Sequence, residues 1–346
     1  MSVALTALTP AAALLLALAI DRWLGEPPVR FHPVVWMGNY LGWTGRRVQQ
    51  VALQGAVGQP VPNGAMVAAL TPDYKAFWLG ALYWSAGAAS FSVAAWWLQS
   101  AVMQGAQAAG GWLGNGASVL LGGVLLALLL KPMLAWRMLQ TEVLAVDAAL
   151  AESLKAGRKR LSWLVSRDTA TLTEAQVRES AIESLAENLS DSVVAPIFWF
   201  VLLGLPGAVL YRFANTADAM WGYKGVYKGQ NWAWAGKWAA RVDDVLNWLP
   251  ARLTGLLLAL MGGVPLAALR REAGKTPSPN SGWPMAAMAL ALAIHLGKPG
   301  VYVLNPAGSA PLVGHTLVAI VYASKVLLAL IPIATLALVF KAWITA

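Results

Sequence analysis

The chain has 346 residues, of which 58% are hydrophobic and only 12% charged, and its mean hydropathy of +0.58 predicts an integral membrane protein, since ordinary soluble domains carry about a quarter charged residues. The lack of cysteine excludes disulfides and cysteine nucleophiles, and three well-separated histidines argue against a zinc enzyme. A net charge of +9 could suit nucleic acid, but in so apolar a chain cytoplasmic loops and anionic lipid or substrate explain it better.

The N-terminal part combines an apolar segment with a polar loop. Residues 3–20 are long enough to cross a hydrocarbon core of about 30 Å as a helix, and they end at a charged pair. Residues 21–38 mix charge with prolines and glycines, which break helices, so we predict an ordered polar loop there. Residues 48–75 are rich in Gly, Pro and Gln, and we predict a surface linker.

Residues 76–130 contain no charged side chain and are divided by a glycine-rich segment, residues 105–116, so we predict two spans joined by a short loop. Basic residues flank this region on both sides. Because cytoplasmic segments carry the excess of Lys and Arg, the flanks should face the cytoplasm of a bacterial inner membrane. A basic cytoplasmic surface explains Lys224 about as well as a role in covering phosphates does.

Two later apolar segments are interrupted by helix breakers. If residues 193–209 crossed fully, the basic residues after them would lie outside, and Gly204 and Pro206 interrupt the segment midway. A re-entrant or hairpin pair of short helices satisfies both observations, and residues 253–269 have the same pattern. With a C-terminal helix over residues 311–340, the prediction is an all-α, polytopic protein in which residues 1–346 form a single membrane-embedded domain with a cytoplasm-facing polar site.

An acidic stripe is the strongest candidate for a site. Thr173 and Gln176 have the spacing of a capping box, so a helix should begin there. At helical spacing, four acids then fall on one face, and this stripe consists of Glu179, Glu183, Glu187 and Asp191. Such a stripe is either a solvated face or a site for a hard cation such as Mg²⁺, and its entry into apolar sequence at the membrane surface favours the cation.

The stripe belongs to residues 167–252, which we predict to be the catalytic core region. Asn215 and Asp218 lie one helical turn apart, and Asp243 and Asn247 repeat this arrangement. Such pairs can bind a metal or a phosphate-bearing ligand, or they can tie helix ends together as internal polar contacts. Ionisable groups in or beside a membrane favour the functional interpretation.

These residues give the sequence a resemblance to the adenosylcobinamide-phosphate synthase family, the CobD/CbiB membrane proteins of cobalamin biosynthesis. The similar blocks follow the family's order over nearly the whole chain. They are Asp21 to Gly38, Arg167-Asp168-Thr169, Glu183 to Asp191, Tyr211 to Tyr223, Ala240 to Arg252 and Ser278 to Gly282. The departures are small: Ala217 and Ala219 stand where a larger or hydroxylated residue is expected, and the linker has no counterpart.

The resemblance implies ATP-dependent formation of an amide between an amino-alcohol phosphate, such as aminopropanol phosphate, and a propionate carboxylate of adenosylcobyric acid. Carboxylates do not react with amines at neutral pH, so activation is needed, for instance as an acyl phosphate. Phosphoryl transfer needs Mg²⁺ and cationic clamps, which agrees with the polar residues above. The implied partners are both substrates, ATP and the lipid bilayer, with a homo-oligomer or association with other cobalamin-pathway enzymes left open.

The resemblance also implies roles for individual residues. The metal-binding candidates are Glu183, Glu187, Asn188, Asp191 and Asp218. The substrate- and phosphate-binding candidates are Arg167, Asp168, Thr169, Arg212, Asn215, Thr216, Tyr223, Lys224, Asn247, Arg252 and Asn280. The catalytic candidates are Asp243, Asp244, Arg241 and His32. Either Asp243 or Asp244 would be a metal ligand or the base for the attacking ammonium group. His32 would take part in acid–base chemistry or contact the corrinoid, or its His-Pro turn is simply structural.

Two other functional classes stay open. Broken hairpins with polar residues resemble the discontinuous helices of transporters, although the sequence has no clear internal repeat and its acids gather beside the cytoplasmic face. A sensory or regulatory protein similar to AmpE, a relative of the family associated with β-lactamase induction, is the other class. The density of Asn, Asp and Arg favours an enzyme over both.

Overall fold

The computed structural model describes residues 8–52 and 72–345, and these are mostly helical. The first half contains α2 (Thr9–Leu24), η1 (Val29–Phe31), α3 (Pro33–Val51), α4 (Tyr74–Leu113), α5 (Asn115–Leu130), η2 (Lys131–Met133), α6 (Trp136–Glu152) and α7 (Leu154–Leu161). The second half contains α8 (Glu174–Leu189), η3 (Ser190–Val194), α9 (Ala195–Leu203), α10 (Leu205–Trp221), α11 (Lys237–Leu246), α12 (Trp248–Gly262), α13 (Leu266–Ala273), α14 (Gly282–Ala291) and α15 (His315–Thr345). The strands are β1 (Val226–Tyr227), β2 (Gln230–Asn231), β3 (Leu296–Lys298) and β4 (Tyr302–Leu304), which form two antiparallel hairpins.

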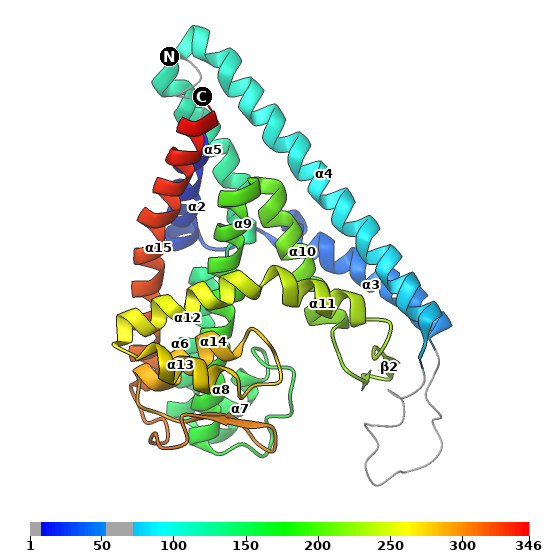
Figure 1. Ribbon diagram of the computed structural model, residues 1–346, viewed down its shortest axis with the longest axis vertical. Coiled ribbons are helices and arrows are strands. Elements are labelled where there is room, and N and C mark those ends of the chain that lie inside the picture. Colours follow the sequence, from blue (N-terminus) through cyan, green and yellow to red (C-terminus); the bar gives the residue numbers. More distant parts are fainter. Residues whose placement is uncertain (1–7, 53–71, 346) are drawn as a thin grey trace.

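Three described helical stretches are long and apolar enough to cross a membrane, which supports the predicted membrane class. They are Asn115–Glu152, Glu174–Leu203 and His315–Ile344. A fourth is reached if α11 and α12, which meet at a bend of 48°, count as one span. In Figure 1, α2, α5 and α15 follow the long axis of the molecule, whereas α12 lies across it.

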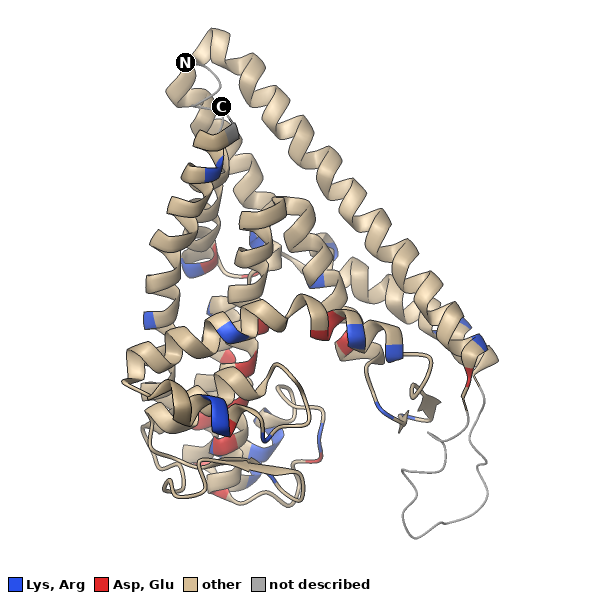
Figure 2. Ribbon diagram, viewed as in Figure 1, with Lys and Arg blue, Asp and Glu red and all other residues tan. Residues whose placement is uncertain are grey.

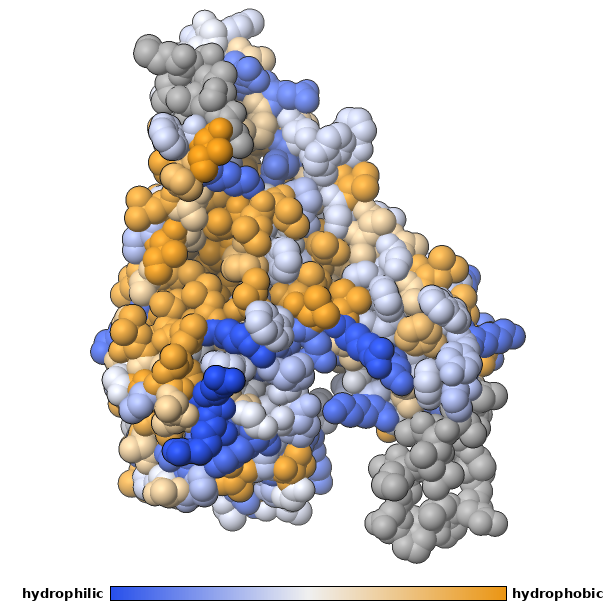
Figure 3. All heavy atoms as spheres, viewed as in Figure 1, coloured by the Kyte–Doolittle hydropathy of each residue, from blue (hydrophilic) through white to orange (hydrophobic). Residues whose placement is uncertain are grey.

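Charged and apolar residues occupy different halves of the molecule. Figure 2 shows most Asp and Glu residues in the half that holds α8, α11 and the β-hairpins, and few charges around the distant ends of α4, α5 and α15. Figure 3 shows apolar side chains covering the face above a row of hydrophilic residues. This division agrees with an apolar membrane half and leaves the polar half to carry a site.

The predicted breaks in the two interrupted segments are confirmed. Gly204, whose φ is 71°, separates α9 from α10, and Gly263, whose φ is 64°, follows the end of α12. Both values lie in the region that glycine adopts without the steric penalty of a Cβ atom. The C-terminal helix predicted over residues 311–340 is observed as α15.

Several predicted boundaries were wrong. The loop predicted over residues 21–38 is shorter, because α2 continues to Leu24 and α3 begins at Pro33. Residues 105–113, predicted as a loop, continue α4 to Leu113, and the chain turns only at Gly114, with φ 77°. A glycine in a helix costs only about 1 kcal/mol relative to alanine, so the few glycines here do not end it. Residues 48–51, predicted as linker, belong to α3, where Gln49 exchanges two hydrogen bonds with the backbone of Asn231. The rest of that linker falls largely on residues 53–71, outside the described residues, as do residues 3–7 of the first predicted span.

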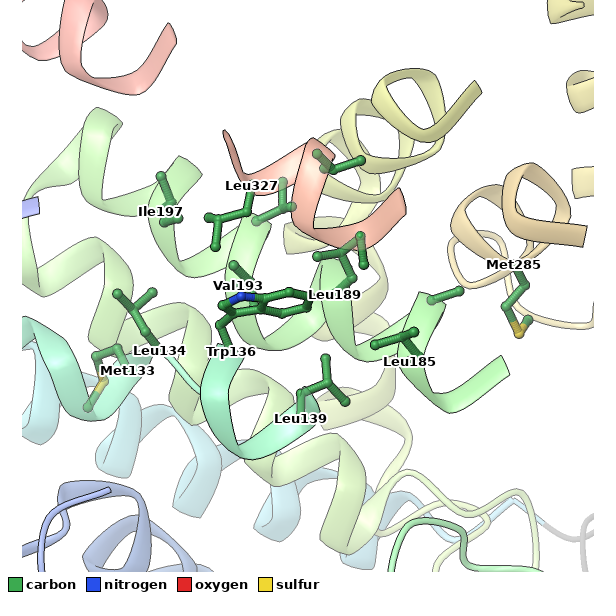
Figure 4. Close-up of a cluster of buried hydrophobic side chains, with 14 of the residues drawn as sticks. Met133, Leu134, Trp136, Leu139, Leu185, Leu189, Val193, Ile197, Met285 and Leu327 are labelled. Atoms are coloured by element: carbon green, nitrogen blue, oxygen red, sulfur yellow. The ribbon is translucent and has the colours of Figure 1, made fainter. Parts of the chain in front are cut away.

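The apolar side of α8 and η3 is packed into the core. Figure 4 shows the Trp136 ring of α6 beside Leu189 and Val193, with Leu139 below it and Leu327 of α15 above. Leu189 and Val193 are fully buried. Burying a side chain of this size contributes about 1.5–3 kcal/mol, so this packing fixes the rotation of α8 and thereby the direction in which its acids point.

Candidate functional site

The acid-bearing helix α8 begins at the predicted capping box. Gln176 N donates to Thr173 Oγ1 at 3.3 Å, and Thr173 N donates to Gln176 Oε1 at 2.9 Å. The predicted apolar face is buried, but Glu179 and Glu183 are also only 6% and 5% exposed. This burial argues against the alternative of a solvated acidic face, because carboxylates are rarely buried without partners.

α8 passes directly into the π-helical turn η3 before α9 begins. Pro196 lacks an N–H and cannot bond to the carbonyl of Ser192, four residues earlier. Ala135 N donates to Ser192 O instead, at 3.1 Å. Proline therefore explains why the regular ladder is interrupted here, and Asp191 lies within the resulting turn. Such π-turns frequently occur at functional sites.

A cavity of about 200 Å³ opens beside the acidic face of α8. We call it the outer cavity, and its lining residues are Leu164, Val165, Ser166, Arg167, Ser180, Glu183, Ser184, Glu187, Asn188, Met285, Lys298 and Tyr302. Within it, both oxygens of Glu183 are occupied: Tyr302 OH donates to Oε1 at 2.9 Å, and Arg167 Nη2 pairs with Oε2 at 3.1 Å. The cavity thus brings together four predicted site residues.

Glu187 and Lys298 also line the outer cavity, and both differ from Glu183 in lacking a partner. Neither side chain has a hydrogen bond or ion pair within residues 8–52 and 72–345. The carboxyl group of Glu187 is close enough to Asp191 and Asp218 to be repelled by their negative charges. The positive charge of Lys298 attracts it. One cavity therefore presents a carboxylate and an exposed ammonium group that no hydrogen bond or ion pair among the described residues engages.

A second group of polar residues lies where η3, α10 and α11 meet. We call it the inner polar cluster, and its members are Asp191, Arg212, Asn215, Asp218, Asp243 and Asn247. Asn247 Nδ2 donates to Asp191 Oδ1 at 2.6 Å, and Asn215 Nδ2 approaches Asp191 Oδ2 at 3.5 Å. Arg212 Nη1 donates to Ser192 Oγ at 3.0 Å. The asparagine of each predicted helical pair is thus brought onto one carboxylate.

Several buried atoms of this region have no hydrogen-bond partner among residues 8–52 and 72–345. They are Asp243 Oδ1, Arg212 Nε and Tyr211 OH. An unsatisfied buried polar group costs about 1–3 kcal/mol, so it is commonly completed by water, an ion or a ligand. Among the described residues, no three His, Asp or Glu side chains converge closely enough to hold a metal by themselves. The donor set therefore fits Mg²⁺ held by one or two carboxylates together with substrate phosphates.

The Asp218 carboxylate is held in a confined position on α10. Burial raises the pKa of Asp218 to about 6, and the charge of Asp244 adds to this rise. A Cβ atom built on Gly222 would lie 2.0 Å from Asp218 Oδ1, so only glycine leaves room for the carboxylate there. A confined acid whose charge is disfavoured is suited to binding a cation.

Asp244, Arg252 and Asn280 form a third group beside the inner polar cluster. Asn280 Nδ2 donates to the Asp244 carbonyl at 2.8 Å, and Arg252 Nη1 donates to Asn280 Oδ1 at 3.2 Å. The Arg252 guanidinium lies 4.1 Å above the Trp248 ring. Arg252 also lines a surface cavity of about 450 Å³ with Arg270. These contacts fix the position of the positively charged Arg252 guanidinium at the edge of the site.

His32 is placed in a different environment from these groups. Its Nε2 lies 3.1 Å from Glu26, and Val34 N donates to its Nδ1 at 3.3 Å, so it caps the start of α3. Glu26 also pairs with the buried Lys131 at 2.7 Å. Burial by itself would raise the pKa of Glu26, but the hydrogen bonds and charges of His32 and Lys131 lower it below its ordinary value. The contacts of His32 are those of a structural His-Pro turn.

Other predicted residues shape the backbone or lie at the surface. Asp168 Oδ1 accepts from Ala170 N at 2.9 Å, and Thr169 Oγ1 donates to the Arg158 carbonyl at 3.0 Å. Thr216 Oγ1 donates to the carbonyl of Arg212 at 2.7 Å. Three further predicted residues are Tyr223, Lys224 and Arg241. The ring of Tyr223 stacks on that of Tyr227 with 3.7 Å between the ring centroids, and Lys224 and Arg241 are exposed.

Sequence reasoning missed Lys298 and Tyr302, which lie more than a hundred residues after α8. They come from the hairpin β3–β4, in which Lys298 pairs with Tyr302 across the turn. Pro299-Gly300 is a turn signal between the two short strands and could have indicated the hairpin. Nothing in the sequence indicates that this hairpin packs on α8. His295, which pairs with Glu179 at 3.2 Å, was missed for the same reason.

Comparison with known proteins gives consistent relatives. The family described as CobD/Cbib protein matches residues 14–330. The "Probable cobalamin biosynthesis protein CobD" of Methanothermobacter thermautotrophicus is 40% identical over 299 residues, covering 84% of this chain and 86% of that protein. The "Cobalamin biosynthesis protein CobD" of Chromobacterium violaceum is 40% identical over 285 residues (82% and 80%), and that of Halalkalibacterium halodurans 36% over 300 residues (84% and 82%). No solved structure matches the chain significantly.

Proposed function

Because the chain belongs to the CobD/Cbib family, and thereby has a role in cobalamin synthesis, we propose that it is an adenosylcobinamide-phosphate synthase. The reaction would join the amine of an amino-alcohol phosphate to a propionate carboxylate of adenosylcobyric acid, at the expense of ATP. The observation that carries the proposal is the position of the outer cavity, with the charges of Glu187 and Lys298, beside the inner polar cluster with its unsatisfied atoms.

The inner polar cluster would be the place where the carboxylate is activated. The propionate oxygen attacks the terminal phosphorus of ATP, forming an acyl phosphate and releasing ADP. Arg212 is close enough to Asp191 to neutralise phosphoryl charge there, and Arg252 and the exposed Arg241 lie at the edge of the site. Mg²⁺, when bound with the phosphates, would supply further charge neutralisation; Asp191 and Asp218 are the residues placed to hold it.

Amide formation then requires a neutral amine. Asp243 is the residue best placed to accept the proton from the ammonium group, since its Oδ1 is buried without a partner near Asp191 and Asp218. The amine attacks the acyl carbon, the phosphate leaves, and the amide forms. Asp244 is less suited to this role, because its Oδ1 accepts from Asn280 Nδ2 at 3.5 Å and its side chain interacts with the positive charge of Lys224.

The site would face the cytoplasm of a bacterial inner membrane. The polar half carries the basic segments around α7 and α13, and positive charge favours the cytoplasmic side. In this orientation the α9–α10 pair would enter the membrane and return to the same side. ATP and the amino-alcohol phosphate would reach the site from the cytoplasm.

The proposal is tested with full-length protein purified in detergent, supplied with adenosylcobyric acid, aminopropanol phosphate and Mg²⁺, with and without ATP. Mass spectrometry of the corrinoid should detect the amide only with ATP. Asp218→Asn should reduce the rate about a hundredfold or more, whereas the exposed Glu152→Gln should leave it unchanged. Folded protein that forms no product under any condition would favour a transporter or an AmpE-like sensor instead.

A further inference from the structure

The outer cavity presents opposite charges that make no ion pair with another described residue. Glu187 on α8 and Lys298 on β3 line it, and neither has an ion-pair partner in the described part of the chain. Arg167 makes its hydrogen bonds through one nitrogen, Nη2, which donates to Ser180 and Glu183. Its remaining N–H groups are available to an acceptor in the cavity. A carboxylate and two cations that share one small space are complementary to a ligand that carries both signs of charge.

The size of the cavity limits the ligand to a small molecule. Its volume of about 200 Å³ lies below the roughly 300–1,000 Å³ of pockets that hold drug-sized ligands. A corrinoid or a nucleoside triphosphate is larger than such ligands and cannot be enclosed there. Most of the lining is polar and includes Ser180, Ser184 and Asn188 on α8 and Tyr302 on β4.

The charges are also ordered along the cavity. Glu187 is the lining acid that reaches Asp191 and Asp218 of the inner polar cluster. Lys298 lies on the hairpin, which packs over α8, and Arg167 lies in the segment before α8. A ligand whose ammonium group meets Glu187 therefore directs that end toward the inner polar cluster, and its anionic end toward Lys298 and Arg167.

We infer that the outer cavity is the binding site for the amino-alcohol phosphate, with Glu187 holding the ammonium group and Lys298 and Arg167 holding the phosphate. The inference rests on the proposed function and names the subsite of one substrate. It places the nucleophilic nitrogen on the side of the cavity where the acyl phosphate would form. Lys298 would be a substrate-binding residue, although it lies outside every sequence block that indicated the family.

The test is direct binding to the full-length protein in detergent, without ATP or corrinoid, by isothermal titration calorimetry. The probes are aminopropanol phosphate and isopropyl phosphate, which lacks the amine. Lys298→Met should weaken binding of both probes about tenfold or more, since a charge-assisted contact is removed. Glu187→Gln should weaken aminopropanol phosphate by a similar factor and leave isopropyl phosphate unchanged or tighter. The matched controls are the exposed Lys75→Met and Glu152→Gln, which should change neither Kd.

The outcomes separate this inference from the proposed function. Unchanged binding of aminopropanol phosphate to both variants, or no binding to the wild type at millimolar concentration, overturns the inference even if the amide assay succeeds. Selective loss of binding in the two variants supports the inference even if no amide is formed, in which case the synthase proposal alone fails. Size-exclusion profiles and thermal unfolding of each variant establish that the fold is intact.

Discussion

The side-chain amide of Asn247 donates a hydrogen bond of 2.6 Å to Asp191, which joins the end of α11 to the π-turn between α8 and α9. Fifty-six positions separate the two residues in the chain. Asn247 is 4% exposed, and its Oδ1 accepts from Ser190 at 3.3 Å. This contact holds the acids of α8 against the polar residues of α10 and α11, and so it assembles the inner polar cluster.

Replacing Asn247 by alanine should therefore destabilise the protein. A hydrogen bond to a charged group contributes about 1.5–3 kcal/mol, and its loss leaves Asp191 with the longer contact to Asn215 alone. Urea unfolding in detergent micelles, followed by tryptophan fluorescence, measures the change. Asn115→Ala, at the exposed start of α5, is the control and should stay within about 0.5 kcal/mol of the wild type. Equal stability of the two variants would contradict the importance of the contact.

Gly222→Ala should lower synthase activity through Asp218. The new methyl group would overlap the Asp218 carboxylate, 2.0 Å away, so that the acid must move. We expect at least a tenfold fall in rate, because small displacements of positioned groups reduce catalysis by about this factor or more. Gly225→Ala is the matched control, because no atom lies within 4 Å of its Cβ position. If both variants keep wild-type rates, Asp218 does not need its present position.

The sequence predicted the parts of this site that depend on local pattern. The capping box placed the start of α8, and helical spacing placed Glu183 and Glu187 on one face. Glycine and proline placed the break at Gly204. Each of these follows from neighbouring residues alone, so one chain suffices to recognise them.

The rest of the site depends on tertiary packing, which no local pattern encodes. The hairpin carrying Lys298 and Tyr302 is placed by its packing on α8 and by Glu272, which accepts from Asn305 N at 2.7 Å just after β4. The position of His32 in a separate group with Lys131 likewise depends on how α2, α3 and η2 meet. Spacing in sequence could not distinguish these environments from the inner polar cluster.

Mg²⁺ and ATP together should stabilise the protein more than either does alone. Mg²⁺ is usually held by one or two carboxylates together with substrate phosphates and waters, so we expect the phosphates of ATP to contribute to its coordination. A ligand that binds only the folded state at a hundred times its Kd adds about 2.7 kcal/mol to stability. Thermal unfolding with Mg²⁺, ATP and both together measures the effect. Asp218→Asn should abolish the joint increase; an undiminished increase in that variant would remove Asp218 from the proposed metal site.

The contribution of Glu272 to stability should disappear in acid. Burial raises its pKa, but hydrogen bonds from Lys275 and Asn305 and the charges of Lys275 and Arg271 outweigh this and lower the pKa below its ordinary value. A depressed carboxyl pKa stabilises the folded state above the unfolded value of about 4.3 and loses this effect as pH falls through the folded value. Glu272→Gln should therefore be less stable than wild type at pH 7, and the difference should vanish as the pH is lowered below about 4. Unfolding curves of both proteins across this range measure it, and a difference that persists unchanged in acid would show that the loss at pH 7 reflects packing and not the carboxylate charge.

Because Glu272 anchors the chain just after β4, the variant should also weaken binding of aminopropanol phosphate at pH 7, although neither Glu187 nor Lys298 is altered.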